Sequence, residues 1–257
     1  MKVNLIKTAV IGALMLPMTT VLAEETTSEW SVGGNVGLYS DYVFRGYTQT
    51  QHQPALQGGF DAEHSSGFYI GTWASNVDWT TAGGYMKDNS IEIDVYGGYA
   101  TEVAGIGIDL GILQFLYPGD NVDAQAETDA TELYIGLSKD LGIASVGVTM
   151  YYVVSTDAWG FSDAEDSIYW DLALDVPLGD TPITASLHWG DQTFEGSGNA
   201  GYDYSDWKVD VSYAINDNFT AGVFYTDTDQ DKSTSYWTVD SEYLGEDVWG
   251  GYLSAGF

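Results

Sequence analysis

The chain has 257 residues, of which 38 are acidic and 7 basic, so its formal net charge is −31, and it contains no cysteine. Because binding to phosphate backbones requires a basic face, this charge excludes nucleic acid as a partner. The lack of cysteine also excludes a disulfide framework and a lipid anchor attached to an N-terminal cysteine.

The first 23 residues are typical of a secretory signal. Lys2 and Lys7 precede the apolar run TAVIGALMLPM, and VLA ends at Ala23, directly before EETTSE. A basic end, a short apolar stretch and small residues at a cleavage point define such a signal, which is too short for a spanning helix. We therefore expect residues 1–23 to be a signal peptide and residues 24–257 to form one domain in an extracytoplasmic compartment.

The rest of the chain repeats an alternation of apolar and polar residues with a period of two. In WKVDVSYAI, the odd positions from Trp207 to Ile215 are apolar, whereas Lys208, Asp210 and Ser212 lie between them. This pattern is typical of a strand with one apolar and one polar face. It predicts strands near residues 31–47, 54–64, 67–78, 90–101, 105–116, 130–139, 142–154, 167–177, 181–191, 204–215, 218–228 and 247–257.

The connections between these segments alternate in length. EVAG and DLG are short, whereas PGDNVDAQAETDA and DTDQDKSTSYWTVDSEYLGED are long and acidic. Short turns at one rim and long loops at the other are typical of bacterial outer-membrane barrels. The predicted fold class is therefore all-β: a transmembrane antiparallel up-and-down β-barrel of about 12 strands in the outer membrane of a Gram-negative bacterium, surrounded by outer-membrane lipids and lipopolysaccharide.

A soluble β-barrel would show the same alternation with its apolar face inward. Two features favour the membrane barrel. The polar positions are rich in Gly, Ser, Thr and Asp but contain almost no lysine, unlike a solvated surface. Aromatic residues also gather at strand ends, as two membrane interfaces require. They are Tyr99, Tyr213, Phe219 and Phe257 towards the short turns, and Trp79, Tyr117, Trp170, Trp189, Trp207, Tyr225 and Trp249 towards the long loops.

The chain ends in GYLSAGF, an alternating segment whose last residue is Phe257. A barrel has no free sheet edge in the membrane, so the last strand must pair with the first, and its outer face must be apolar to the end. We expect Phe257 at the periplasmic interface. A terminal aromatic of this kind resembles the recognition signal of the outer-membrane assembly machinery, which implies that machinery as a transient partner.

The segment SDYVFRGYTQTQHQPALQGGFDAEHSSGFYIGTWASNVDW, residues 40–79, contains runs of the form SDY-x-FRG, PA-x-QGG-x-D and GFY-x-G-x-W-x-SNV. It resembles the TorF family of outer-membrane porins, conserved proteobacterial barrels of the Gcw_chp type. Thr48 stands where that family usually has serine, which retains the hydroxyl. The resemblance implies a barrel with a pore and implies no catalytic residues. The matching residues are Ser40, Asp41, Tyr42, Phe44, Arg45, Gly46, Gln49, Pro54, Ala55, Gln57, Gly58, Gly59 and Asp61.

Because side chains alternate along a strand, the odd or even position of each residue assigns it to one of the two faces of the barrel wall. Val32, Val36, Leu38 and Phe44 are expected to face lipid, and Asn35, Tyr39, Asp41, Arg45, Gln57, Asp61 and Glu63 to face the lumen. A hairpin centred near Gln51 would place Arg45 opposite Gln57 and Asp41 opposite Asp61, with Arg45 in diagonal reach of both acids. These residues form either a charge network that braces the wall or a constriction that contacts the solute.

The other residues expected in the lumen are mostly acidic: Glu92, Asp94, Asp109, Glu132, Asp171, Asp175 and Asp210, with Lys208 as a further cation. Rings of acids in a water-filled pore favour cations and repel anions. The residues predicted to line the pore or its constriction are Asp41, Arg45, Gln57, Asp61, Asp94, Asp109, Asp171, Lys208 and Asp210.

Two functions remain open at this point. The first is a porin-like channel for the passive passage of small neutral or cationic solutes. The second is a closed structural or surface-binding barrel whose acidic loops hold divalent cations or partners. An outer-membrane hydrolase is a weaker alternative, because parity places Ser186 and His188 inside the barrel, away from the lipid. The sequence predicts no enzyme, no cofactor and no specific metal site.

Overall fold

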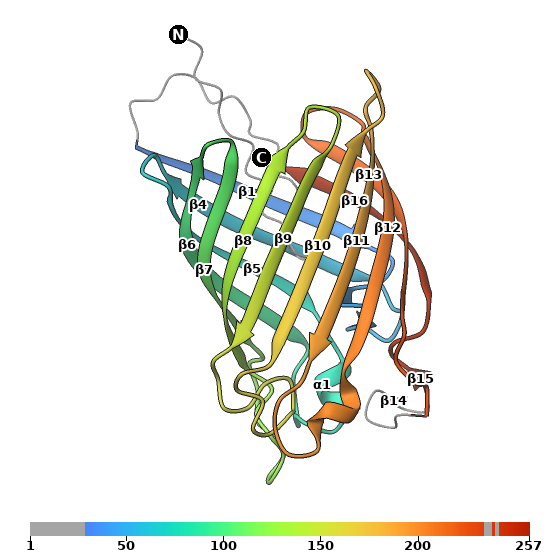
Figure 1. Cartoon of the computed structure of the whole chain (residues 1–257). Helices are drawn as coiled ribbons and strands as arrows, with labels where there is room; N and C mark the ends of the chain where they lie inside the picture. Colours follow the sequence, from blue (N-terminus) through green and yellow to red (C-terminus); the bar gives the residue numbers. More distant parts are fainter. Residues whose placement is uncertain (1–28, 234–237, 240–241) are drawn as a thin grey trace.

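The described part of the chain, residues 29–233, 238–239 and 242–257 of a computed structural model, forms one closed barrel (Figure 1). In these residues, 12 strands pair antiparallel in chain order around the barrel. They are β1 (Trp30–Tyr39), β4 (Ala55–His64), β5 (Phe68–Asn76), β6 (Ile91–Val103), β7 (Ile106–Leu116), β8 (Ala130–Asp140), β9 (Ser145–Val153), β10 (Ile168–Pro177), β11 (Ile183–Thr193), β12 (Tyr204–Ala214), β13 (Phe219–Thr228) and β16 (Val248–Gly256). The predicted all-β barrel of 12 antiparallel strands is confirmed.

The long-loop rim carries small additional elements. Two short hairpins consist of β2 (Val43–Phe44) with β3 (Tyr47–Thr48), and β14 (Thr238–Val239) with β15 (Glu242–Tyr243). The short helices are α1 (Trp79–Ala82) and the 3-10 helix η1 (Asn199–Tyr202). No helix among the described residues has the length and apolarity needed to cross a membrane. The predicted signal peptide, residues 1–23, lies outside the described residues.

The strand alternation separates an apolar outer face from a polar inner face. In β1, Val32 and Leu38 are 72% and 59% exposed, as the parity predicted. On the inner face, Glu92, Asp94 and Asp171 are each 1% exposed. This is the reverse of a soluble barrel, in which the carboxylates would face outward. The outer surface is suited to hydrocarbon, because the barrel satisfies its backbone hydrogen bonds internally.

The predicted pairing of the last strand with the first is confirmed, because β16 pairs with β1 from Asn35 opposite Gly256 to Tyr39 opposite Tyr252. Beyond β16, Phe257 exchanges two backbone hydrogen bonds with Gly34, at 2.8 and 3.0 Å. The Phe257 ring is 61% exposed on the outer face and lies edge-on to Phe60. The closing seam therefore extends to the last residue of the chain.

Most of the predicted aromatic girdle lies on the outer face. Trp170, Trp189, Trp207 and Trp249 are exposed there, and the Tyr225 ring lies between the rings of Trp207 and Trp249. At the short-turn rim, Tyr99, Tyr213, Phe219 and Phe257 are exposed as well.

For two members of the girdle the prediction is wrong. Trp79 and Tyr117 are buried inside the barrel, with their ring centroids 5.3 Å apart. Tyr117 directly follows β7 and continues the inward parity of Phe115, whereas Trp79 is the first residue of helix α1. Their rings therefore cover the interior instead of facing lipid.

Candidate functional site

The pairing register of β1 and β4 differs from that of the expected hairpin. In the structure Tyr39 pairs with Ala55, Gly37 with Gln57 and Gly33 with Asp61, so the expectation that Arg45 lies opposite Gln57 is wrong. With this register β1 ends at Tyr39, and residues 40–54 leave the wall. We call residues 40–54 the inner loop. It contains the small β2–β3 hairpin, whose turn is Arg45-Gly46.

The inner loop crosses the bore. It starts from β1 and β4, and the Arg45 side chain at its tip contacts residues of β8, β9, β10 and β11, which lie across the ring of strands. Arg45 and Tyr47 are 4% and 3% exposed, and Thr48 is fully buried. The interior is therefore filled at this level by a polar segment of the chain itself. Phe44, predicted to face lipid, packs instead against the Phe115 and Trp159 rings.

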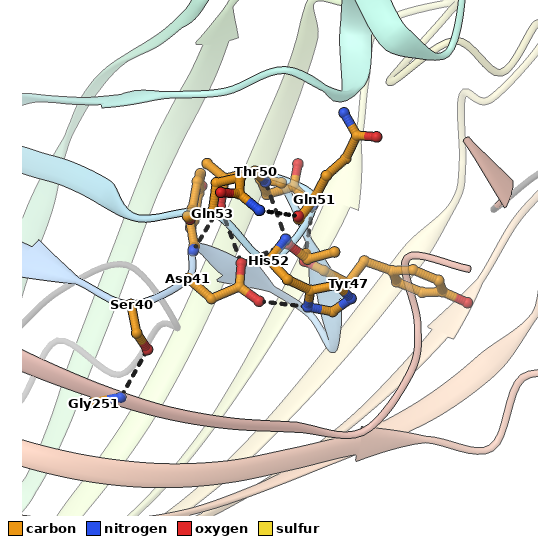
Figure 2. A network of polar contacts seen from close by, with 11 residues as sticks. Ser40, Asp41, Tyr47, Thr50, Gln51, His52, Gln53 and Gly251 are labelled. Carbon is orange, nitrogen blue, oxygen red and sulfur yellow. Dashed lines mark hydrogen bonds and ion pairs between the residues drawn. The ribbon is translucent and has the colours of Figure 1, made fainter. Parts of the chain in front are cut away.

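The base of the inner loop is held by Asp41. Its carboxylate accepts hydrogen bonds from Thr48 Oγ1 at 2.5 Å and Thr50 Oγ1 at 3.1 Å, and lies 2.9 Å from His52 Nδ1 (Figure 2). Burial raises the pKa of the Asp41 carboxyl, whereas the hydrogen bonds from Thr48 and His52 act to lower it. The expectation that Asp41 lies opposite Asp61 is wrong, because Asp41 has turned into the loop.

The tip of the inner loop is a buried ion pair enclosed by aromatic rings. Arg45 Nη2 lies 2.8 Å from Glu132 Oε2, and Nη1 donates to Gln192 Oε1 at 3.1 Å. The guanidinium carbon is 4.1 Å from the centroid of the Tyr169 ring, within cation–π distance. Tyr204 Oη also donates to the Arg45 carbonyl at 2.9 Å. The loop tip is thus anchored by charge, ring faces and backbone together.

The turn at this tip depends on glycine. Arg45 and Gly46 have φ values of 46° and 84°, the left-handed pair that a two-residue hairpin turn requires. A Cβ on Gly46 would lie 2.4 Å from Thr228 Cγ2 and 2.8 Å from Asp206 Cβ. The hairpin tip therefore packs against β12 and β13 with no room for a side chain.

We expect Gly46→Ala to destabilise the fold more than Gly105→Ala. Both substitutions place a side chain at positive φ, which costs about 1–2 kcal/mol, but a Cβ on Gly105 meets nothing within 4 Å. The extra overpacking at Gly46 adds roughly 1–3 kcal/mol. Urea unfolding of the refolded proteins, followed by tryptophan fluorescence, measures the difference. Equal losses in the two variants would mean that the loop tip does not pack against the wall.

A second polar cluster supports the ring that faces Arg45. Tyr169 Oη donates to Asp206 Oδ2 at 2.9 Å, and His188 lies between Asp206 at 2.9 Å and Asp171 at 3.3 Å. Gly190 makes this possible, because a Cβ there would lie 2.0 Å from Tyr169 Oη. Sequence reasoning missed Asp206 and this use of His188.

Tyrosines hold several lumenal carboxylates, three of them from two strands away around the barrel, a feature that sequence reasoning also missed. Tyrosine hydroxyls donate to Glu92 from Tyr42 at 2.6 Å, to Asp61 from Tyr96 at 2.5 Å, to Asp109 from Tyr69 at 2.7 Å and to Asp210 from Tyr252 at 3.2 Å. The inward parity of the three tyrosines that belong to barrel strands was readable from the sequence. Their partners were not, because each pair depends on the stagger of the closed sheet.

The other predicted site residues lie on the inner face but are not gathered around Arg45. Gln57 and Asp61 are each 9% exposed, on the β4 wall. Lys208 Nζ lies 4.5 Å from the centroid of the Phe224 ring. Ser186 donates to Asp175 at 2.5 Å, so the two residues considered for a hydrolase have separate carboxylate partners.

Some buried carboxylate oxygens have no hydrogen-bond partner among the described residues. These are both oxygens of Asp94 and one oxygen each of Glu132, Asp171 and Asp210. In the same part of the chain, no group of three or more His, Asp or Glu side chains could hold a metal ion. The buried acids therefore give the bore a negative character.

Residues 23–257 match the family described as a bacterial protein of unknown function, Gcw_chp. The chain belongs to the Gcw_chp family. No curated protein matches the sequence significantly. The name TorF stays a prediction, whereas the Gcw_chp assignment covers every strand of the barrel.

Solved porin structures share the fold of this Gcw_chp protein. The NanC porin has a TM-score of 0.57 at 11% identity, over 88% of this chain and 99% of that chain. The KdgM porin has a TM-score of 0.52 at 7% identity, over 88% of this chain and 97% of that chain. At these identities the likeness shows a porin-like barrel and nothing about the solute.

Proposed function

We propose that the protein is an outer-membrane channel for the passive passage of small neutral or cationic solutes. The observation that carries the proposal is the combination of an apolar, aromatic-edged outer face with an inner face of carboxylates. The first suits a bilayer, and the second suits an aqueous path. In this proposal residues 1–23 direct export, Phe257 engages the assembly machinery, and lipid and lipopolysaccharide surround the barrel.

The inner loop sets the width of the proposed path. Arg45 and Glu132 together contribute little net charge, so a solute that reaches this level meets a compensated ion pair. Beyond this level, three half-buried acids lie on the inner face: Asp109, Asp175 and Asp210. Acids of this kind repel anions and favour cations.

A closed barrel is the second candidate, and the burial of the inner loop is the observation that favours it. Planar-bilayer recordings of the full-length mature chain distinguish the two. A channel gives discrete current steps and, in a salt gradient, a reversal potential of the sign for cation preference. The channel would be refuted, and the closed barrel supported, if the chain inserts into vesicles as a folded barrel but the current stays at baseline.

We expect neutralising the half-buried lumenal acids to reduce cation preference. The triple variant Asp109→Asn, Asp175→Asn and Asp210→Asn removes three negative charges from the inner face, so the reversal potential should move towards that of a non-selective pore. The matched control is Asp140→Asn, Asp180→Asn and Asp217→Asn, which removes three acids at or beside the short turns. An equal shift in both triple variants would place the selectivity outside the bore.

A further inference from the structure

The inner loop forms the floor of a pocket at the long-loop rim, which we call the mouth pocket. It encloses about 630 Å³ of empty space, including solvent at its opening. Its walls come from the inner loop, the loops after β5, β9 and β13, and the ends of β11 and β12. The lining is mostly aromatic, with Tyr47, Trp79, Tyr85, Phe194 and Tyr204 among its members. Concave, aromatic-lined sites are typical of small-molecule binding.

Two residues of the pocket lining, Trp79 and Gln49, carry polar groups that lack a hydrogen-bond partner in the described part of the chain. Trp79 is 9% exposed, and its indole N–H has no hydrogen-bond partner among the described residues. Gln49 also lines the pocket; it donates its amide N–H to the Tyr47 carbonyl at 3.0 Å, and its side-chain oxygen accepts no hydrogen bond from the described residues. In contrast, Gln192 accepts from Arg45 and donates to two backbone carbonyls. The residues of the lining thus include one unpaired donor and one unpaired acceptor.

These features favour one class of ligand, a neutral ring that carries hydroxyl groups. A hydrocarbon would leave the Trp79 N–H unpaired, which is costly for a buried donor. An anion would approach Arg45, whose charge Glu132 already compensates, next to the acids of the bore. A cation would find no carboxylate among the residues that line the pocket. A neutral ring with hydroxyl groups avoids all three penalties, because its apolar faces can pack on the rings while its hydroxyls pair with Trp79 and Gln49.

We propose that the mouth pocket binds a neutral sugar directly outside the constriction. This inference rests on the proposed channel in one respect: the bound sugar would be the solute that next meets Arg45 and Glu132. Binding itself does not require passage. A sugar held against Trp79 and Gln49 would occupy the mouth whether or not the bore conducts.

Titration calorimetry with glucose and with maltose tests the pocket on the full-length mature chain. The chain is kept in a polyoxyethylene detergent, because sugar-headed detergents would compete. Trp79→Phe retains a ring but removes the N–H, and should weaken sugar binding about 3- to 10-fold, the loss of one hydrogen bond. Gln49→Leu should weaken it as well. Trp189→Phe, on the outer face, is the matched control and should bind like the parent chain.

Three results would overturn the sugar site: no binding of either sugar, binding that Trp79→Phe and Gln49→Leu leave unchanged, or tighter binding of choline or glucuronate than of maltose. The outcomes separate this inference from the proposed channel. Sugar binding without bilayer current would refute the channel and leave the mouth pocket intact. Current without sugar binding would refute the pocket alone.

Discussion

Shortening the inner loop is expected to raise single-channel conductance several-fold. Replacing residues 42–52 by a short Gly-Ser linker removes the segment that reaches from β1 and β4 to the opposite wall. Glu132→Gln is included in the variant, because loss of Arg45 would otherwise leave a buried carboxylate without its partner. Planar-bilayer recording of step size, with the Glu132→Gln chain beside it, measures the effect of the loop itself.

The control for this experiment is the shortening of another loop at the same rim. Residues 120–126 in the loop between β7 and β8 are exposed or half-buried, and none of them is fully buried, so shortening them should leave the step size unchanged. If the variant with the shortened inner loop has the same single-channel conductance as the parent chain, the constriction lies at another level. If both deletions raise conductance equally, the effect is general loosening of the rim.

Truncating Glu132 is expected to cost about 3–5 kcal/mol of unfolding free energy, the penalty for leaving one partner of a buried ion pair uncompensated. Glu132 is fully buried and Arg45 is 4% exposed, so water cannot replace the lost carboxylate. The measurement is urea unfolding of Glu132→Ala in lipid vesicles. The double variant Arg45→Met with Glu132→Leu should recover most of the loss, because no charge is then left without a partner.

An exposed ion pair provides the comparison for this loss. Lys232 and Glu246 lie 3.1 Å apart, but their side chains are 64% and 51% exposed. Glu246→Ala should therefore leave the unfolding free energy almost unchanged. A Glu132→Ala loss as small as that of Glu246→Ala would show that water reaches Arg45, and that the inner loop does not seal the bore at its tip.

The strands were predictable because their signal is local. The alternation predicted strands near 105–116 and 204–215, and the structure has Ile106–Leu116 and Tyr204–Ala214. The same parity put Asp94, Asp171 and Asp210 on the inner face, where they lie. Each of these inferences needs only neighbouring residues along one strand, since side chains alternate between the two faces.

The inner loop was not predictable in the same way. Tyr42 and Phe44 continue the apolar alternation of β1, so the sequence pattern does not show where the wall ends. The register decides that point, by pairing Tyr39 with Ala55 and releasing residues 40–54. A shift of pairing register changes every cross-strand neighbour, which is why the expected contacts of Arg45 with Gln57 and Asp61 were wrong.

By itself, then, the sequence determined the strands, their apolar outer face and the acidic character of the interior, because a period of two needs no knowledge of distant residues. Only the tertiary structure decided that Arg45 pairs with Glu132, which is 87 residues away. Closure of the barrel brings β8 to β11 opposite β1 and β4. A buried guanidinium requires a partner, and the partner that this geometry supplies is on the far wall.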